Sequence, residues 1–362
     1  MRSKRALLPS LLTLVVLVLT ACRAPAAAQS PTGEISCKIA LLLPESKTAR
    51  YETQDLPNFK NRLKELGFDT QLLIYSNANQ DAATQQQQAE AALTNGANVL
   101  VLDPVDSDAA AKIADLAKSK NVPVIAYDRL IKGSDGVTYY ISFDNEQVGR
   151  LQGAALLTAL AGKVNPTIVM INGSPTDNNA NLFKRGAHSV LDGQVIIAKE
   201  YDTPDWSPDK AQREMEQALT TLNNQVDGVY AANDGTAGGA IAAMKAAGIQ
   251  PPPPVTGQDA ELAAIQRILA GEQYMTVYKA IKPEANVAAE LAYALCHGDQ
   301  PDESLVNGRV DNGKITVPAI LLAPISVTKD NLMQTVVADQ FWSVDQICTA
   351  DFKNFCDAAG IK

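Results

Sequence analysis

From Lys38 onward, short apolar runs alternate with helical patterns, and this alternation limits the possible folds more than any other feature. Apolar runs without polar alternation are typical of parallel strands covered by helices on both faces. The sequence predicts strands at residues 39–43, 71–75, 98–102, 123–126, 139–143, 167–171, 195–198, 228–231 and 255–257. Helices are predicted around Phe59 to Gly67 and at residues 81–93, 109–118, 146–160, 179–191, 207–222, 238–247, 261–269 and 283–296. Strand–helix alternation of this kind predicts a doubly wound α/β fold.

The stretch from Val122 to Asn145 predicts where one domain ends and another begins. Its first strand ends in Asp128 and Arg129, and the carboxyl ends of strands are where open α/β sheets bind ligands. A second apolar run breaks off at Asp144, and a helical pattern follows. We interpret this second run as a bridge between two domains.

An internal repeat favours two equivalent lobes. Asp128 follows Asp103 by 25 positions, and Asp259 follows Asp234 by the same interval. Each interval contains a strand-end Asp, an Ala-rich helix, a Pro-Val strand and another strand-end Asp. Two such lobes would bring both sets of strand ends to one cleft.

The expected domain boundaries follow from three predicted crossings. Besides the run at 139–143, strands at 274–278 and 319–322 are expected to pass between the lobes, which forms a three-strand hinge that permits closure. The first lobe is predicted to contain residues 37–143 and 279–322. The second is predicted to contain residues 144–278 and 323–362, including a C-terminal appendix.

Composition excludes several classes of function. The 362 residues suit two domains, and the formal net charge of −9 without a basic patch argues against a nucleic-acid partner. With only His188 and His297, and no Cys or His cluster at ligand spacing, no metal site and no cofactor are expected.

The N-terminus predicts export and a lipid anchor. Arg2, Lys4 and Arg5 precede an apolar run at residues 11–19, which is too short for a comfortable membrane span. The run ends in Leu-Thr-Ala-Cys22, which looks like a bacterial lipobox; an ordinary secretory signal cut nearby is the alternative. We therefore expect a signal peptide at 1–21, lipid on Cys22, and a flexible tether at 22–36.

Four further cysteines allow disulfides outside the cytoplasm. Cys348 and Cys356 lie close together in sequence, so a local bridge is expected there. Cys37 and Cys296 either pair or stay buried and reduced.

The strand ends and the loops after them carry planar polar groups in both predicted lobes. Singly, an Asp or Asn before a helix is usually an N-cap, an Asp beside an Arg is often an ion pair, and a lone Trp usually belongs to the core. Recurrence favours a binding site, since carboxylate, amide and guanidinium groups match vicinal sugar hydroxyls and aromatic rings cover sugar C–H faces. The residues are Arg50, Tyr51, Asp128, Arg129, Asp177, Asn178, Asn179, Trp206, Asn233, Asp234, Asp259 and Lys279.

Enzyme motifs do not fit. The GTAGGA segment lacks the lysine of a P-loop, no GxGxxG follows the first strand, and Ser174 is not in a GxSxG turn. Asp128 and Asp259 are conceivable as a glycosidase pair. We set that aside because the chain has the size of a two-lobe binder and a lipid tether.

The chain resembles the type I periplasmic sugar-binding proteins of ABC transporters, and among them the binders of D-xylose, over residues 38–336. The resemblance is carried by AYDR, YISFDN, GSPTDNNA, NDGTAGGA, GQDAEL and MTVYK, at Ala126, Tyr140, Gly173, Asn233, Gly257 and Met275. It implies sugar contacts from Arg50, Asp128, Arg129, Asp177, Asn179, Trp206, Asn233, Asp259 and Lys279. Tyr51 stands where the xylose binders have tryptophan, which keeps an aromatic face but reduces its area.

The resemblance also implies partners. A monosaccharide is the expected ligand, with D-xylose first and glucose or another aldose as alternatives. We expect a monomer on the outer face of the cytoplasmic membrane or in the periplasm, serving an ABC permease and ATPase. A sensor that presents its closed form to a chemoreceptor or sensor kinase is the alternative, whereas a repressor would carry a helix-turn-helix where this chain has a signal.

Overall fold

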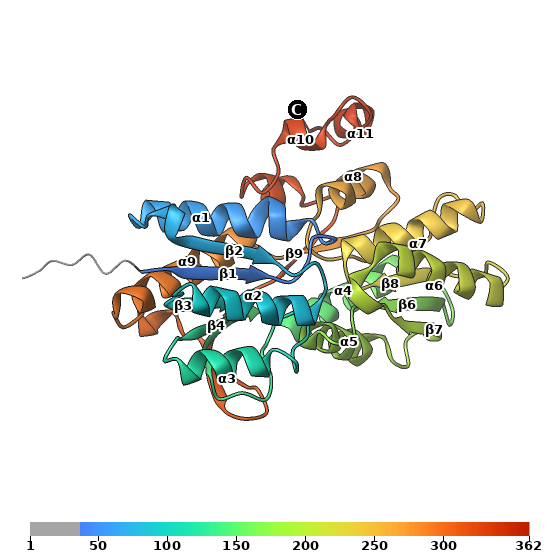
Figure 1. The fold of residues 1–362 in the computed structure, drawn as a ribbon. Coiled ribbons are helices and arrows are strands. Elements are labelled where there is room, and N and C mark those ends of the chain that lie inside the picture. The colour runs from blue at the N-terminus through green and yellow to red at the C-terminus, as the bar shows by residue number, and fades with distance from the viewer. Residues whose placement is uncertain (1–36, 362) are drawn as a thin grey trace, which may run out of the picture. The chain divides into compact units, whose positions relative to one another are not determined.

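The computed structural model describes residues 37–361, and its N-terminal lobe is built on a seven-stranded sheet (Figure 1). The strand order is β10-β11-β5-β4-β3-β1-β2, and only the β10–β11 pair is antiparallel. The strands are β1 (Ile39–Leu43), β2 (Leu73–Asn77), β3 (Val99–Leu102), β4 (Val124–Tyr127), β5 (Val137–Phe143), β10 (Gly308–Asp311) and β11 (Thr316–Leu322).

Helices cover both faces of this sheet because its central strands are apolar on both sides. Leu41 of β1 belongs to a core with α1 and α9, whereas Leu42 belongs to a second core with α2 and α3. The helices are α1 (Leu56–Glu65), α2 (Ala82–Thr94), α3 (Ala111–Ser119) and α9 (Ile281–His297). The predicted doubly wound layers are thus present in this lobe.

The C-terminal lobe has a smaller parallel sheet in the order β7-β6-β8. Single bridges from Val255 to Val229 and from Gln258 to Val277 extend it toward β9, which pairs with β12 in antiparallel fashion. The strands are β6 (Thr167–Asn172), β7 (Ile196–Asp202), β8 (Gly228–Ala231), β9 (Thr276–Tyr278) and β12 (Ile325–Val327). The helices are α4 (Asn145–Ala159), α5 (Asn178–Leu191), α6 (Pro208–Thr221), α7 (Asp234–Ala246) and α8 (Leu262–Ala270).

Three predictions about elements are wrong in detail. Residues 255–257 form only an isolated bridge, and β2 begins at Leu73 because residues 70–72 form a 3₁₀ turn. The helix predicted at 207–222 begins at Pro208, and Ser207 in its N-cap position makes no side-chain capping hydrogen bond. The antiparallel strand β10 has no counterpart among the predicted strands, since its alternating exposure gives it no continuous apolar run.

The chain passes between the lobes at the three expected places: after β5, after β9, and between β11 and β12. Residues 37–361 nevertheless fall in one compact unit. The two-part boundaries that the sequence suggests stay a prediction. The predicted signal peptide, Cys22 and the whole predicted tether (22–36) lie outside the described residues.

The C-terminal cap, which we define as residues 338–361, contains α10 (Val344–Ile347) and α11 (Lys353–Ala358). It stands beside α8 in Figure 1 and shares a hydrophobic core with it. A disulfide joins Cys348 to Cys356, and a second joins Cys37 to Cys296, with Cα atoms 5.9 and 5.8 Å apart. The second pairing decides between the alternatives that the sequence left open.

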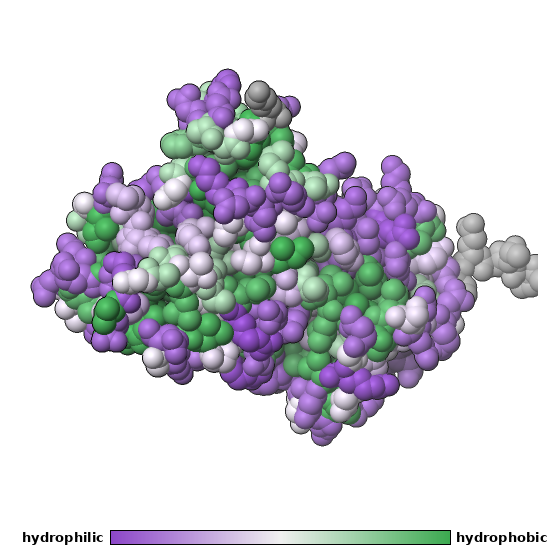
Figure 2. All heavy atoms as spheres, turned by 180° about the vertical axis from the view of Figure 1, so that it is seen from behind, coloured by the Kyte–Doolittle hydropathy of each residue, from purple (hydrophilic) through white to green (hydrophobic). Residues whose placement is uncertain are grey.

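The surface of the described chain is mixed. Figure 2 shows hydrophobic residues lying between hydrophilic ones on the face opposite to Figure 1, including on the cap. The exposed large hydrophobic residues come from separate elements, as is normal for globular proteins: Val164, Ile196, Ile325 and Phe355. Within residues 37–361, no helix has both the length and the apolar character to cross a bilayer.

Candidate ligand-binding site

Ten of the twelve strand-end candidates, all except Asn178 and Asp234, line one cavity between the lobes. They are Arg50, Tyr51, Asp128, Arg129, Asp177, Asn179, Trp206, Asn233, Asp259 and Lys279, and each is at most 4% exposed. Thr48, Phe183 and Gln258 complete the lining. Most of the lining residues are charged or polar, so the cavity suits a small polar molecule.

The two aspartates of the internal repeat have the same unusual backbone. Asp128 and Asp259 both lie in the left-handed region, with φ of 53° and 91°. The N–H of Asp128 donates to the carbonyl of Ile141 at 2.8 Å, and that of Asp259 donates to the carbonyl of Val277 at 2.9 Å. Such backbone strain persists only where surrounding contacts enforce it, and it clusters at functional sites. Neither aspartate is a helix cap, so the cap interpretation fails for this pair.

Asp128 is held as an anion by cations from two segments. Its Oδ1 lies 3.2 Å from Nη1 of Arg50 and 3.4 Å from Nζ of Lys279, and the Tyr51 hydroxyl donates to Oδ2 at 3.4 Å. Burial alone would raise the pKa of Asp128, but the charges of Arg50 and Lys279 outweigh it and hold this pKa well below the usual range. The carboxylate therefore accepts hydrogen bonds throughout the physiological pH range.

Lys279 connects the two aspartates. Its Nζ lies 3.3 Å from Oδ1 of Asp259, which is in turn 3.9 Å from Nη1 of Arg50. Burial lowers the pKa of Lys279, but the negative charges of Asp128 and Asp259 outweigh burial and raise this pKa above its usual value. The ammonium therefore stays charged. Apart from these ion-pair contacts, Oδ1 of Asp259 has no hydrogen-bond partner among the described residues. It is therefore an acceptor in the cavity wall that is available to a ligand.

Arg50 is fixed from behind by two carboxylates that sequence reasoning missed. Its Nε and Nη2 donate to Asp55 at 3.0 and 2.7 Å, and Nη2 also lies 2.8 Å from Glu284. Asp55 ends the π-helical turn Tyr51–Asp55 that follows Arg50, so local spacing could have suggested it. Glu284 lies in α9, 234 residues away, where no local sequence signal points to the site.

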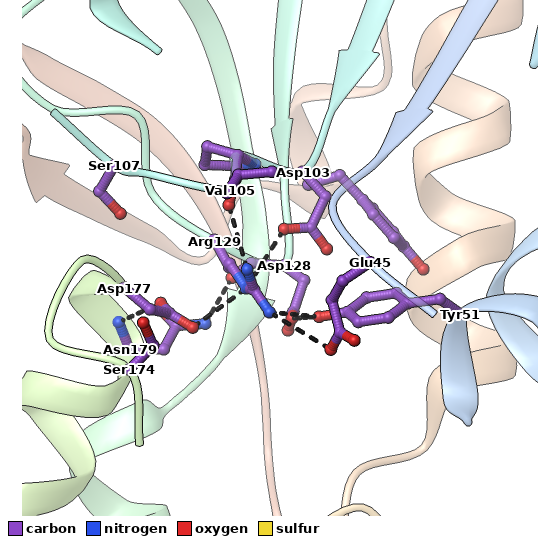
Figure 3. A network of polar contacts seen from close by, with 12 residues as sticks. Glu45, Tyr51, Asp103, Val105, Ser107, Asp128, Arg129, Ser174, Asp177 and Asn179 are labelled. Atoms are coloured by element: carbon purple, nitrogen blue, oxygen red, sulfur yellow. Dashed lines mark hydrogen bonds and ion pairs between the residues drawn. The ribbon is translucent and has the colours of Figure 1, made fainter. Parts of the chain in front are cut away.

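Arg129 crosses the cleft, as Figure 3 shows. Its Nε lies 3.0 Å from Oδ2 of Asp177 in the C-terminal lobe and 3.6 Å from Oδ1 of Asp103. Its Nη2 donates to the Tyr51 hydroxyl at 3.1 Å. An ion pair between the neighbours Asp128 and Arg129, one interpretation of their adjacency, does not form. Asp128 pairs instead with Arg50 and Lys279.

Two predicted residues are caps as well as cavity lining. Asp177 caps α5 by accepting from the N–H of Asn179 at 2.8 Å, and Asn233 caps α7 by accepting from the N–H of Thr236 at 2.8 Å. Asn179 also donates from Nδ2 to the carbonyl of Asp128 at 2.9 Å, which joins the lobes. The cap interpretation is correct for Asp177 and Asn233, but it does not remove them from the cavity.

The aromatic residues differ in how free their rings are. Trp206 lies over Gly173, where a Cβ atom would be 2.0 Å from the ring, and its Nε1 donates to Oδ2 of Asp177 at 3.1 Å. Two guanidinium groups lie over the Tyr51 ring, with the Cζ atoms of Arg50 and Arg129 at 5.2 and 5.7 Å from its centroid. Stacking of Tyr51 on a sugar stays a prediction.

Phe183 is a lining residue that the sequence interpretation overlooked. It follows Asn179 by four positions in α5, and residues four apart share one helix face. Its ring meets Trp206 edge-on, with centroids 6.3 Å apart. The i, i+4 spacing from a strand-end asparagine was therefore a usable signal.

The cavity is lined by cationic side chains, by carboxyl groups from both lobes and by aromatic rings. Carboxylates accept and guanidinium and ammonium groups donate, a set that matches a molecule bearing several adjacent hydroxyls. Within residues 37–361, no cluster of three or more His, Cys, Asp or Glu side chains has the geometry of a metal site.

Comparison with known proteins places the chain among binding proteins. The sequence pattern of the periplasmic binding protein domain matches residues 39–300. The D-xylose-binding periplasmic protein of Escherichia coli is 39% identical over 84% of this chain and 90% of its own length. The multiple sugar-binding periplasmic protein of Azospirillum brasilense is 37% identical over 85% of this chain and 90% of its own.

A solved structure agrees with the sequence relatives. The carbohydrate transporter solute binding protein from Chloroflexus aurantiacus, in complex with D-glucose, superposes with a TM-score of 0.78. The two sequences are 30% identical, and the match covers 86% of this chain and 98% of that one. The type I periplasmic binding protein fold, with parallel-sheet lobes, is thereby confirmed.

Proposed function

The chain belongs to the periplasmic binding protein family, and from this membership we propose that it binds one monosaccharide between its lobes and delivers it to an ABC importer. The proposed ligand is an aldose, with D-xylose first and glucose as the alternative. The observation that carries the proposal is a small cavity into which both lobes project planar polar side chains. Its functional residues would be the ten predicted candidates that line the cavity.

The chemistry of the cavity supports a neutral polyhydroxyl ligand over an ion. Arg50, Arg129 and Lys279 are each already paired with protein carboxylates. An anionic ligand would have to compete with Asp128 and Asp177, whereas a hydroxyl can accept from a cation and donate to the paired carboxylate at once. Hydrogen bonds to ionised groups are about twice as strong as neutral ones, which suits a ligand without charge.

The relatives support a sugar without selecting one. One is a D-xylose-binding protein, another a multiple sugar-binding protein, and a structural neighbour holds D-glucose. D-Xylose stays the first expectation because it is the ligand in the name of a relative with 39% identity. The chain is proposed to act at the outer face of the cytoplasmic membrane or in the periplasm, tethered by lipid on Cys22.

A test measures shape and stability with and without ligand. X-ray scattering and thermal melts of the mature protein should be recorded alone and with D-xylose, D-glucose and a panel of other aldoses. At least one sugar should reduce the radius of gyration and raise the melting temperature, since a ligand that binds only the folded protein stabilises it. An Asp259→Ala variant serves as the control and should show a smaller response. If no aldose changes either quantity in the wild type, the proposed function is wrong.

A further inference from the structure

Two neighbouring aromatic residues of the C-terminal cap lie directly behind the site. Trp342 donates from Nε1 to the carbonyl of Ala260 at 2.7 Å, and Ala260 follows the cavity residue Asp259. The ring of Phe341 meets that of Tyr278 edge-on with centroids 5.1 Å apart, and Tyr278 precedes Lys279. Each aromatic residue therefore contacts the chain one position away from a residue that lines the cavity.

The segment that Trp342 contacts has a conformation that requires external support. Asp259 and Ala260 are consecutive non-glycine residues in the left-handed region, with φ of 91° and 49°, which side chains disfavour. The N–H groups of the two residues donate to Val277 and to Thr276, both in β9. Trp342 donates to the carbonyl of Ala260. The indole thus adds a hydrogen bond to a segment that β9 holds through its N–H groups.

The cap also contacts the N-terminal lobe. Nε2 of Gln54 donates to the carbonyl of Phe341 at 3.3 Å. Gln54 lies in the turn Tyr51–Asp55, which carries the cavity residue Tyr51 and follows Arg50. The same dipeptide that supports Asp259 in one lobe therefore touches the site-bearing turn of the other lobe.

The rest of the cap is attached firmly to the C-terminal lobe. The carbonyl of Ile347 accepts from Gln266 of α8 at 3.2 Å, and Ile347, Cys356 and Ile361 are buried in one core with α8. The Cys348–Cys356 disulfide joins the segments on either side of the cap's connecting loop. Because the cap is fixed to this lobe, it can hold the residues that it contacts in place.

We propose that the C-terminal cap is a working part of the binding site: Trp342 positions Asp259, Phe341 positions Lys279, and the Gln54–Phe341 contact favours closure of the lobes. Neither aromatic residue lines the cavity, so both act through the residues they support. This inference rests on the proposed function, because its readout is the affinity for a monosaccharide.

The first experiment removes the indole N–H and keeps a ring. Trp342→Phe in the full mature protein should weaken binding of the best aldose by about tenfold, because a buried hydrogen bond is lost and Asp259 is released. Leu219→Ala is the control, since Leu219 is buried in the core between α6 and α7, away from the cap. Its melting temperature should fall at least as far, with unchanged affinity.

A second measurement separates positioning from mere stability. If Trp342 acts through Asp259, adding Trp342→Phe to an Asp259→Ala protein should cost less affinity than adding it to the wild type. Gln54→Leu, which removes the contact with Phe341 and a long hydrogen bond from Asn58 at 3.4 Å, should weaken binding about threefold with little change in melting temperature. The Gln54→Leu variant also keeps the test decisive if the Trp342→Phe protein does not fold.

The outcomes distinguish this inference from the proposed function. A wild-type protein that binds no aldose overturns the proposed function, and this inference with it. A wild type that binds an aldose, together with Trp342→Phe and Gln54→Leu proteins of wild-type affinity, overturns the role of the cap alone. Equal losses from Trp342→Phe with and without Asp259→Ala overturn the assignment of Trp342 to Asp259.

Discussion

Nε of Arg129 lies 3.0 Å from Oδ2 of Asp177, and this buried ion pair joins the two lobes across the cavity. Both side chains are 3% exposed, and removing one partner of such a pair typically costs about 3–5 kcal/mol because a charge is left buried. The pair therefore favours the arrangement in which the lobes touch. A ligand between them would add its own contacts to a closed form that the protein already stabilises.

Trp206 donates to the same carboxylate, and its ring position depends on Gly173. A Cβ on residue 173 would lie 2.0 Å from the ring, so Gly173→Ala should displace the indole and cost about 1–3 kcal/mol of stability. We expect a loss of sugar affinity of at least about fivefold, measured by calorimetric titration. The control is Gly308→Ala in β10, where the nearest atom is 3.4 Å from the added carbon. Equal affinities in the two variants would contradict the role of Trp206.

The raised pKa of Glu261 predicts that the stability of the folded protein depends on pH. Burial, followed by the negative charges of Asp234 and Asp259, raises its pKa to about 8, with Arg267 acting in the opposite direction. A carboxyl whose folded pKa is raised takes up a proton on folding, so its contribution is fully present below about pH 4 and is lost as pH rises toward 8. The pKa of Asp234 is raised to about 7, mainly by burial, and acts in the same direction.

The measurement is the melting temperature at pH 5 and pH 8. The wild type should melt at a lower temperature at pH 8, and Glu261→Gln, which mimics the protonated side chain, should reduce this difference. Glu216→Gln, an exposed change on α6, should leave the difference as it is. A pH dependence that is identical in all three proteins would mean that Glu261 stays ionised in the folded state.

The two disulfides should differ in their contribution to stability. Unreduced peptides should show Cys37 linked to Cys296 and Cys348 linked to Cys356. Because the bridges span 259 and 8 residues, loop-closure entropy predicts losses of roughly 5.5 and roughly 2.5 kcal/mol when each pair is replaced by serines. Denaturant unfolding measures both. A larger loss from the short bridge would contradict the entropic argument.

The sequence predicted the fold well because the parallel strands carry continuous apolar runs. The strand β1 begins and ends where it was predicted, as does β8. Strand β10 was not predicted because its residues alternate between partly and fully exposed positions at the edge of the sheet. An edge strand of this kind resembles a loop in composition, and only its pairing with β11 defines it.

The candidate site was predictable where chemistry sits at strand ends and unpredictable where it comes from other elements. Asp128 and Asp259 stood out through their repeated context. Glu284, which fixes Arg50, lies within a helix and has no distinguishing neighbours. Adjacency misled in one case: Arg129 pairs with Asp177 across the cleft, whereas Asp128 pairs with Arg50 and Lys279, which are distant in sequence.

Lipid attachment is expected to depend on Cys22, which lies outside the described residues. Cells that express the full chain and are fed labelled palmitate should label the wild type and not Cys22→Ser. The Cys348→Ser variant is a matched control, since it removes a cysteine that the structure places in a disulfide, and it should keep the label. An unlabelled wild type would favour the ordinary secretory signal.

The final prediction concerns the two aspartates that end the repeated units, one from each lobe. Replacing Asp128 or Asp259 by alanine removes a charged acceptor and leaves sugar hydroxyls buried without partners. We expect a loss of about 2–4 kcal/mol in binding, or roughly thirty- to a thousand-fold in affinity. Calorimetric titration beside thermal melts separates this from a structural role, in which stability would fall while affinity stayed constant.

The same titrations on double variants test which charged residues of the site are energetically coupled. Asp128 lies 3.2 Å from Arg50 and forms no ion pair with Arg129, so Asp128→Ala and Arg50→Ala should be non-additive by about 0.5–3 kcal/mol. Asp128→Ala and Arg129→Ala should be closer to additive, although adjacency in sequence suggests the reverse. The structure therefore predicts that the effect of Asp128→Ala on affinity depends on Arg50 and not on Arg129. Stronger coupling of Asp128 to Arg129 than to Arg50 would show that the site binds its ligand in a different arrangement of charges.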